Sequence, residues 1–148
     1  MPKIAIINTK WNAQFVGNCT EACLMRLHEH GVEESEVQVF TLPWAVEIPL
    51  LAKTLLTEKD FDAVIAIAVI YRGWIYRHEY VAQGVVSEII RLNSEIGKPI
   101  FSSVLTPDTN HFHNPEKQEF YLEHLKEKGR EVADAYIETM QVYKGLVC

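Results

Sequence analysis

The sequence has few cysteines, a deficit of basic residues and no long apolar run. Cysteine occurs three times in 148 residues, at Cys19, Cys23 and Cys148. The count is odd, and the three positions lack the spacing of a disulfide-rich secreted scaffold. Fourteen lysines and arginines stand against twenty acidic residues, a formal net charge of −6, which is the wrong sign for a nucleic-acid surface. Because no apolar run approaches the roughly 20 residues that span a bilayer, we expect a cytoplasmic protein that binds neither nucleic acid nor membrane.

Several common functional motifs are also missing. The chain contains no Walker loop, no G-x-G-x-x-G and no G-x-S-x-G, which weakens nucleotide-dependent and serine-hydrolase interpretations. His111 and His113 form one H-x-H pair, and His78 and His124 are further candidate ligands. No fixed zinc-motif spacing accompanies them, so a metal site is the minority interpretation and we expect none.

Short apolar runs alternate with helical patterns along the chain. Runs typical of strands occupy residues 3–8, 37–42, 61–70 and 99–105. Apolar residues at helical spacing occupy residues 15–30, 45–57 and 80–93. Residues 116–144 predict one or two helices, with Gly129 as the candidate break. This alternation predicts an α/β fold with a four-stranded parallel sheet flanked by helices, and the absence of a linker or repeat predicts a single domain over residues 1–148.

Polar and aromatic residues gather where the predicted strands end, the edge at which parallel sheets bind ligands. Trp11 suits stacking on a planar heterocycle and Asn12 suits hydrogen bonding to its edge, although an indole here could instead plug the core. Glu47, at a predicted helix start, suits a polyol ligand. An ordinary acidic residue of a first helical turn would look the same.

The residues after the third predicted strand include a candidate for proton transfer. His78 lies between Arg77 and Glu79, which places a proton carrier beside a fixed cation and a carboxylate. Gly73 permits a tight turn or a close backbone approach to a ligand. A solvated helix start with mixed charges explains the same residues equally well.

Taken in order, these segments resemble the 6,7-dimethyl-8-ribityllumazine synthase family. The resemblance covers nearly the whole chain and rests on five segments. These are Lys10-Trp11-Asn12, Pro-Trp-Ala-Val-Glu-Ile-Pro at 43–49 (P-G-[AS]-[FY]-E-[IL]-P in the family), the strand-end block at 73–80, Val-Leu-Thr-Pro at 104–107 and Lys128-Gly129. The decameric branch, with its G-I-Y-R-H-[DE]-[FY] and V-L-T-P-H patterns, is the most similar.

The resemblance implies a flavodoxin-like fold and a homo-oligomer built from pentamers, with active sites between neighbouring subunits. It implies that 5-amino-6-ribitylaminouracil condenses with 3,4-dihydroxy-2-butanone 4-phosphate. An imine forms, phosphate leaves, and ring closure with loss of water gives 6,7-dimethyl-8-ribityllumazine. Neither a metal nor an organic cofactor is needed, and catalysis would rest on proximity with assisted proton transfer.

The resemblance also implies substrate-binding roles. Trp11 takes the place of the aromatic residue that stacks on the pyrimidine ring, with Asn12 beside it. The segment that binds the ribityl chain corresponds to Ala45, Val46 and Glu47. The stretch whose backbone reads the uracil edge corresponds to Val69, Ile70 and Tyr71.

The remaining roles concern catalysis, phosphate and the neighbouring subunit. Arg77 stands where the icosahedral branch has its proton-donating histidine, and His78 is the adjacent titratable group, so these two are the expected catalytic residues. Trp74 and Ile75 belong to the strand-end block, where Trp74 lies beside the phosphate pocket. Two positions match residues reached from the neighbouring subunit, Ser102 and Lys128.

Several residues depart from the family pattern. Trp44 replaces its glycine, Val46 its aromatic residue and Trp74 a small residue, while Tyr71 is bulkier than the usual valine or isoleucine. Phe120 aligns with the arginine that clamps phosphate in the icosahedral branch, which leaves that role to His124 or Lys126. The alternative function is therefore a non-catalytic oligomeric assembly module, or a flavin-binding relative with an occluded active site.

Overall fold

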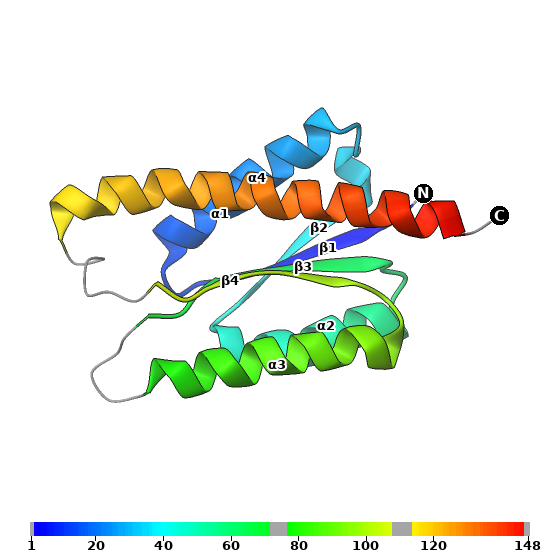
Figure 1. Ribbon diagram of the computed structural model, residues 1–148, viewed down its shortest axis with the longest axis horizontal. Coiled ribbons are helices and arrows are strands. Elements are labelled where there is room, and N and C mark those ends of the chain that lie inside the picture. The colour runs from blue at the N-terminus through cyan, green and yellow to red at the C-terminus, as the bar shows by residue number, and fades with distance from the viewer. Residues whose placement is uncertain (1, 72–76, 108–113, 147–148) are drawn as a thin grey trace.

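The computed structural model describes residues 2–71, 77–107 and 114–146. Within these ranges the chain forms a parallel sheet with helices on both faces (Figure 1). The strands are β1 (Ile4–Thr9), β2 (Val37–Leu42), β3 (Ala63–Val69) and β4 (Ile100–Leu105). Their order is β2-β1-β3-β4, which is the order of flavodoxin-like sheets. The predicted four-stranded parallel α/β fold is therefore confirmed.

The burial of each strand follows from its place in the sheet. Every residue of the central strand β3 is buried, which explains its uninterrupted apolar sequence. The edge strands β2 and β4 carry exposed and half-buried side chains. β1 aligns with β2 from Ile4 opposite Val37 to Thr9 opposite Leu42. This register brings the carboxyl ends of the two strands level.

The helices form two outer layers. α1 (Ala13–Glu29) and α4 (Pro115–Leu146) cover one face of the sheet (Figure 1). α2 (Ile48–Glu58) and α3 (His78–Ile96) cover the other. Both α1 and α3 begin two residues earlier than their apolar patterns predict.

The start of α2 differs from the prediction of a helix from residue 45. Ala45–Glu47 form a 3-10 turn and the α-helix begins at Ile48. Pro49 then occupies the first turn of α2, where its missing N–H is not needed. A second 3-10 turn, Glu34–Glu36, leads into β2.

α4 continues as one helix through Gly129, so the candidate break does not occur there. Gly129 is buried, and a Cβ atom on it would lie 2.2 Å from the Cys19 carbonyl oxygen and 3.0 Å from Ala22 Cβ. The glycine therefore allows α4 to cross close against α1.

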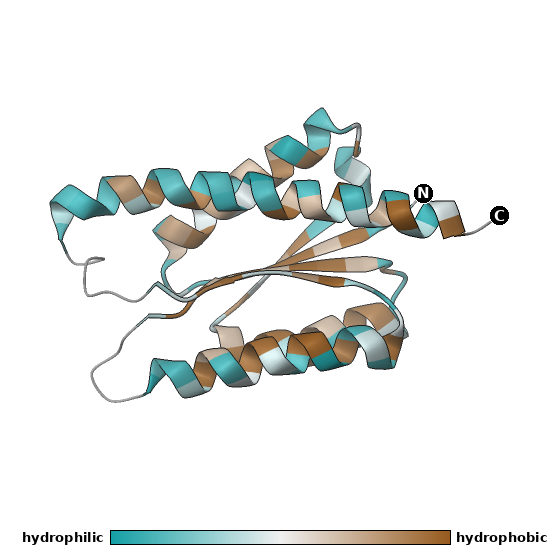
Figure 2. Cartoon of the chain, in the orientation of Figure 1, coloured by the Kyte–Doolittle hydropathy of each residue, from teal (hydrophilic) through white to brown (hydrophobic). Residues whose placement is uncertain are grey.

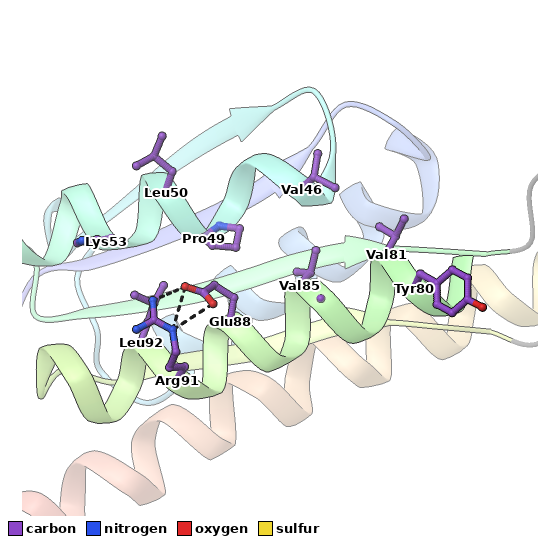
Figure 3. A pocket seen from close by; sticks show the side chains of 11 residues that line it. Val46, Pro49, Leu50, Lys53, Tyr80, Val81, Val85, Glu88, Arg91 and Leu92 are labelled. Carbon is purple, nitrogen blue, oxygen red and sulfur yellow. Dashed lines mark hydrogen bonds and ion pairs between the residues drawn. The ribbon is translucent and has the colours of Figure 1, made fainter. Parts of the chain in front are cut away.

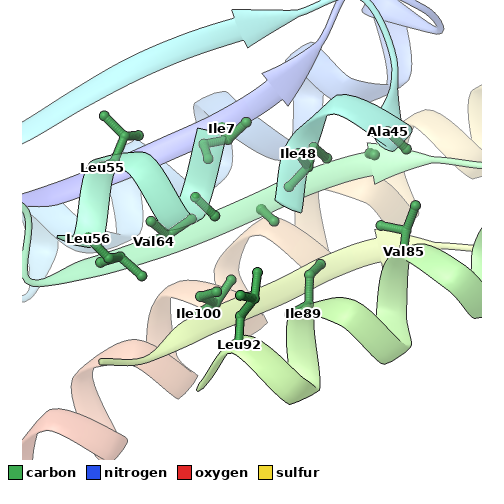
Figure 4. Close-up of a cluster of buried hydrophobic side chains, with 14 of the residues drawn as sticks. Ile7, Ala45, Ile48, Leu55, Leu56, Val64, Val85, Ile89, Leu92 and Ile100 are labelled. Atoms are coloured by element: carbon green, nitrogen blue, oxygen red, sulfur yellow. The ribbon is translucent and has the colours of Figure 1, made fainter. Parts of the chain in front are cut away.

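Two hydrophobic cores lie on opposite faces of the sheet. One fills the space beneath α2 and α3 and includes Ile48, Leu55 and Ile89 (Figure 4). The other lies beneath α1 and α4 and includes Val16 and Leu27. The central strands supply both cores and are largely apolar along their length (Figure 2). No helix in the described ranges has both the length and the hydrophobicity that crossing a membrane requires.

Candidate active site

Backbone hydrogen bonds hold together the segments that follow β1 and β2. The Lys10 N–H donates to the Leu42 carbonyl at 2.8 Å, and the Trp11 N–H donates to the Pro43 carbonyl at 3.3 Å. These bonds extend the ladder between the two strands beyond their ends. The first two predicted groups of site residues are therefore neighbours in space.

Trp11 lies at this edge of the sheet and is 54% exposed. Its ring packs against that of Trp44, with centroids 5.0 Å apart and planes inclined by 32°. Trp44 has φ −149° and ψ 175°, an extended conformation open to any residue, so the indole that replaces the family's glycine causes no backbone strain. The indole pair presents an apolar surface that suits a flat heterocycle.

Asn12 connects this edge to β3. Its backbone is left-handed, with φ 63° and ψ 37°, a conformation that asparagine adopts more readily than most residues. Its amide Nδ2 donates to the Val69 carbonyl at 3.1 Å. Any bond from this side chain to a ligand would therefore come from the other amide hydrogen or from Oδ1.

The segment predicted to bind a ribityl chain is the 3-10 turn before α2. Ala45 is buried, whereas Val46 and Glu47 are exposed. Glu47 is the N-cap of α2, but its side chain makes no capping hydrogen bond. The carboxylate is therefore not a helix cap, and Glu47 lies exposed at the helix start, where an ordinary acidic residue of a first helical turn would also lie.

Near the end of β3, some backbone groups already form hydrogen bonds with other parts of the chain. Val69 and Ile70 are buried and Tyr71 is half-buried. The Ile70 N–H donates to the Leu105 carbonyl at 2.8 Å. Some backbone groups of this stretch therefore bind the neighbouring segments of the chain. Trp74 and Ile75 lie outside the described residues.

The two expected catalytic residues come at the start of α3. The imidazole of His78 is mostly covered, and its Nδ1 lies 3.5 Å from Glu79 Oε1. Arg77 is exposed, with Nε 3.8 Å from Glu79 Oε2 and its guanidinium 5.4 Å from the centre of the Tyr80 ring. The structure therefore places the predicted proton carrier, cation and carboxylate together, with the arginine facing solvent.

The candidate phosphate-binding residues lie on α4. His124 is exposed and stacks on the ring of Phe120, with centroids 5.9 Å apart and planes inclined by 6°. Lys126 pairs with Glu123 at 2.9 Å. This helix covers the face of the sheet opposite to α2 and α3 (Figure 1).

The two residues expected to act from a neighbouring subunit lie on α4 and β4, and not on the segments that carry the indole pair. Lys128 lies on α4, where its Nζ pairs with Glu131 Oε2 at 3.0 Å. Ser102 is exposed on the edge strand β4, and its hydroxyl accepts the Val104 N–H at 3.3 Å.

A groove of about 610 Å³ between α2 and α3 was not predicted (Figure 3). Val46, Tyr80 and Val81 line its apolar part, and Arg91 and Glu88 form an ion pair in its wall. A signal for this groove was present in the sequence, because apolar residues interrupt the polar faces of both helices. The most exposed of them is Leu50, at 74%.

The described residues include no group of three or more histidine, cysteine or acidic side chains arranged to hold a metal ion. His111 and His113 lie outside the described residues. Cys19 and Cys23 are buried, and desolvation raises the pKa of their thiols to about 11 and about 12. These two thiols are therefore protonated packing groups at neutral pH.

Comparisons with known proteins agree on one family. The family model described as 6,7-dimethyl-8-ribityllumazine synthase matches residues 1–144. A 6,7-dimethyl-8-ribityllumazine synthase 2 from Pseudomonas syringae pv. tomato is 34% identical over 145 residues, 97% of this chain and 84% of the relative. A 6,7-dimethyl-8-ribityllumazine synthase from Rhodococcus erythropolis is 33% identical, over 97% of this chain and 92% of its own.

A further relative, from Cupriavidus necator, carries the same name and is 31% identical over 97% of this chain and 82% of its own. These matches span almost the whole chain and favour the enzyme over the non-catalytic alternative. The chain therefore belongs to the 6,7-dimethyl-8-ribityllumazine synthase family, transferases of riboflavin biosynthesis.

Proposed function

We propose that this chain condenses 5-amino-6-ribitylaminouracil with 3,4-dihydroxy-2-butanone 4-phosphate at the carboxyl edge of its sheet. One observation carries this placement: the backbone bonds between the ends of β1 and β2 hold the exposed Trp11 beside the turn that ends at Glu47. A heterocycle with a polyol tail needs these two surfaces next to each other.

The two surfaces suit different parts of the ribityl substrate. The pyrimidine ring would stack on the Trp11 indole, a contact worth about 0.5–1.5 kcal/mol beyond its buried area. Hydroxyl groups of the ribityl chain would donate to the Glu47 carboxylate, and hydrogen bonds to charged groups contribute about 1.5–3 kcal/mol each. Val46, Tyr71 and the adjoining residues Trp74 and Ile75 would complete the walls.

The chemistry needs proton transfers but no redox step. The 5-amino group of the uracil attacks the ketone of the second substrate, and loss of water gives an imine. Elimination of phosphate, with loss of a proton from the neighbouring hydroxyl-bearing carbon, leaves an enol that tautomerises to a new ketone. Attack of the ribityl-bearing nitrogen on this new ketone closes the ring with loss of a second water. We assign proton transfer to His78 and the fixed positive charge to Arg77, because the two adjoin at the start of α3.

The complete site would lie between two subunits of a homo-oligomer built from pentamers, acting in the cytoplasm. His124 and Lys128 project from α4, on the opposite face of the sheet from α2, and Ser102 is exposed on an edge strand. The exposed apolar side chains of Leu50 and Ile90 also support a subunit contact on the outer faces of α2 and α3.

The proposal is tested by mixing both substrates with the purified protein and recording the absorbance of the lumazine product. We expect lumazine to accumulate with the wild type. In an Arg77→Ala/His78→Ala variant the rate should fall by about 100-fold or more, because general acid–base catalysis typically contributes at least that factor.

A matched double variant, His28→Ala/Arg130→Ala, replaces an exposed histidine and an exposed arginine away from α3, and should keep the wild-type rate. If the wild type forms no lumazine, the proposed activity is wrong. If the Arg77→Ala/His78→Ala variant is as fast as the wild type, the assigned residues are wrong.

A further inference from the structure

We propose that Trp44 is a positioning residue, whose indole holds the Trp11 indole in the orientation in which it stacks on the ribitylaminouracil ring. The inference rests on the proposed role of Trp11. The family pattern that this segment resembles has glycine where this chain has Trp44. The contact between Trp44 and Trp11 is therefore a feature of this chain and not of the pattern.

The geometry of the pair decides where a substrate ring can lie. Stacked rings are separated by about 3.5 Å, so a ring inserted between two indoles would need their planes about 7 Å apart. The centroids of Trp11 and Trp44 are only 5.0 Å apart. The pair therefore closes the face of Trp11 that meets Trp44, and the substrate must stack on the other face. Trp11 remains 54% exposed beside Trp44, which leaves accessible surface for that contact.

Trp44 is the anchored member of the pair. It is half-buried and packs against the core beneath α2 and α3, as Phe40 and Leu42 also do. Trp11, in contrast, extends from a turn at the edge of the sheet. An exposed indole without such support would sample several rotamers and lose that freedom on binding. A fixed indole reduces this entropic cost and so raises affinity.

The backbone of Trp11 is already held, so its side chain is the part that Trp44 orients. The Trp11 N–H donates to the Pro43 carbonyl, next to Trp44 in the chain, at 3.3 Å. The Thr9 hydroxyl donates to the Trp11 carbonyl at 3.2 Å. Both indoles therefore extend from paired segments whose register is fixed.

The first test is calorimetric titration of 5-amino-6-ribitylaminouracil into the oligomer as purified. We expect Trp44→Leu to bind about two- to tenfold more weakly, the range for one aromatic pair, and Trp44→Phe to recover most of the loss. In a Trp11→Leu background, Trp44→Leu should cause no further loss, because it acts through Trp11. Tyr143→Leu, a half-exposed ring on α4, is the matched control and should bind like the wild type.

The second test does not depend on the substrate. Two indoles in contact couple their electronic transitions, which gives a pair of bands of opposite sign in circular dichroism. We expect this signal in the wild type and in Tyr143→Leu, and its loss in Trp11→Leu and in Trp44→Leu. Persistence of the signal in Trp44→Leu would overturn the proposal, since the coupling would then come from other rings.

The two proposals fail in different ways. If Trp11→Leu binds the substrate normally, the proposed site itself is wrong, and so is the role of Trp44. If Trp11→Leu weakens binding while folded Trp44→Leu does not, only the role of Trp44 is overturned. Tighter binding by Trp44→Leu or Trp44→Gly also overturns it, because Trp44 would then compete with the substrate.

Discussion

Asn12 uses its backbone and its side chain for different purposes at the candidate site. The left-handed backbone, with φ 63°, turns the chain from β1 into α1, and the Asn12 carbonyl accepts the Val16 N–H at 3.0 Å. The side chain donates to the Val69 carbonyl at 3.1 Å. A left-handed conformation costs an ordinary residue about 1–2 kcal/mol, so the two contributions can be separated by substitution.

We expect Asn12→Ala to lower the free energy of unfolding by about 2–3 kcal/mol, because alanine loses the amide bond and also pays for the left-handed backbone. Asn12→Gly relieves the backbone strain and should lose about 1 kcal/mol. Urea unfolding of both variants measures the difference. Equal losses would show that the backbone conformation is not what selects the residue.

Asp134 is a second residue whose contacts give a definite expectation. Its Oδ1 accepts from Arg26 Nε at 2.8 Å and lies 2.8 Å from His30 Nε2, so it links α4 to the end of α1. The hydrogen bond from Arg26, supported by that from His30, lowers the pKa of the Asp134 carboxyl below its ordinary value of 3.8. This stabilisation is complete above that ordinary value and is lost as the pH falls through the lowered pKa.

Asp134→Asn should therefore be less stable than the wild type at pH 7, and the difference should shrink as the pH falls below about 4. Denaturant midpoints measured between pH 7 and pH 3 test this. Glu138→Gln, another acidic residue of α4, exposed to solvent, should show a smaller change at pH 7. A difference for Asp134→Asn that stays constant with pH would contradict the assignment.

At the scale of elements, the apolar pattern was enough to predict each strand and most of each helix. The run 61–70 predicted β3 because a central parallel strand is buried on both faces. The pattern could not predict that α4 continues through Gly129, since that glycine serves a contact with α1 rather than a helix end. Crossing points between helices depend on tertiary packing, which a local pattern does not contain.

Gly129→Ala tests that crossing. Alanine normally stabilises a helix interior by about 1 kcal/mol relative to glycine. Here the new Cβ would lie 2.2 Å from the Cys19 carbonyl oxygen, a backbone atom that cannot rotate away. We expect a net destabilisation of about 1–3 kcal/mol, the usual range for overpacking, measured by thermal or urea unfolding.

Gly17→Ala, in α1, is the control, because nothing lies within 4 Å of the position where its Cβ would be placed. It should be neutral or stabilising. If Gly129→Ala is stabilising as well, α4 and α1 do not pass as closely as described.

The arrangement of the candidate site was predictable only in part, for a related reason. The rule that parallel sheets bind ligands at their carboxyl edge correctly brought the segments of Trp11 and Glu47 together. The bond from Asn12 to Val69 and the contact between Trp11 and Trp44 depend on side-chain directions. Sequence spacing does not fix those directions across three strands.

At the scale of the whole molecule, the proposed site requires two subunits, which gives a complementation test. A Glu47→Ala variant and a Lys128→Ala variant should each be impaired, because each damages one half of every site. In oligomers reassembled from an equal mixture, about a quarter of the interfaces would combine two intact halves. We therefore expect about a quarter of the wild-type rate, above the sum of the residual rates.

The control mixes Glu47→Ala with Trp11→Leu, which damage the same half of the site. Reassembly of these two should restore nothing. If Glu47→Ala and Lys128→Ala also restore nothing, while oligomers of both form, the site lies within one subunit.

The crystal structure of the protein bound to 5-amino-6-ribitylaminouracil tests the central claim most directly. We predict that the pyrimidine ring lies parallel to the Trp11 indole, on the face away from Trp44, with ribityl hydroxyls within hydrogen-bonding distance of the Glu47 carboxylate. Substrate bound instead beside Glu88 and Arg91, in the groove between α2 and α3 and away from Trp11, or protein atoms packed over the face of Trp11 away from Trp44, would contradict it.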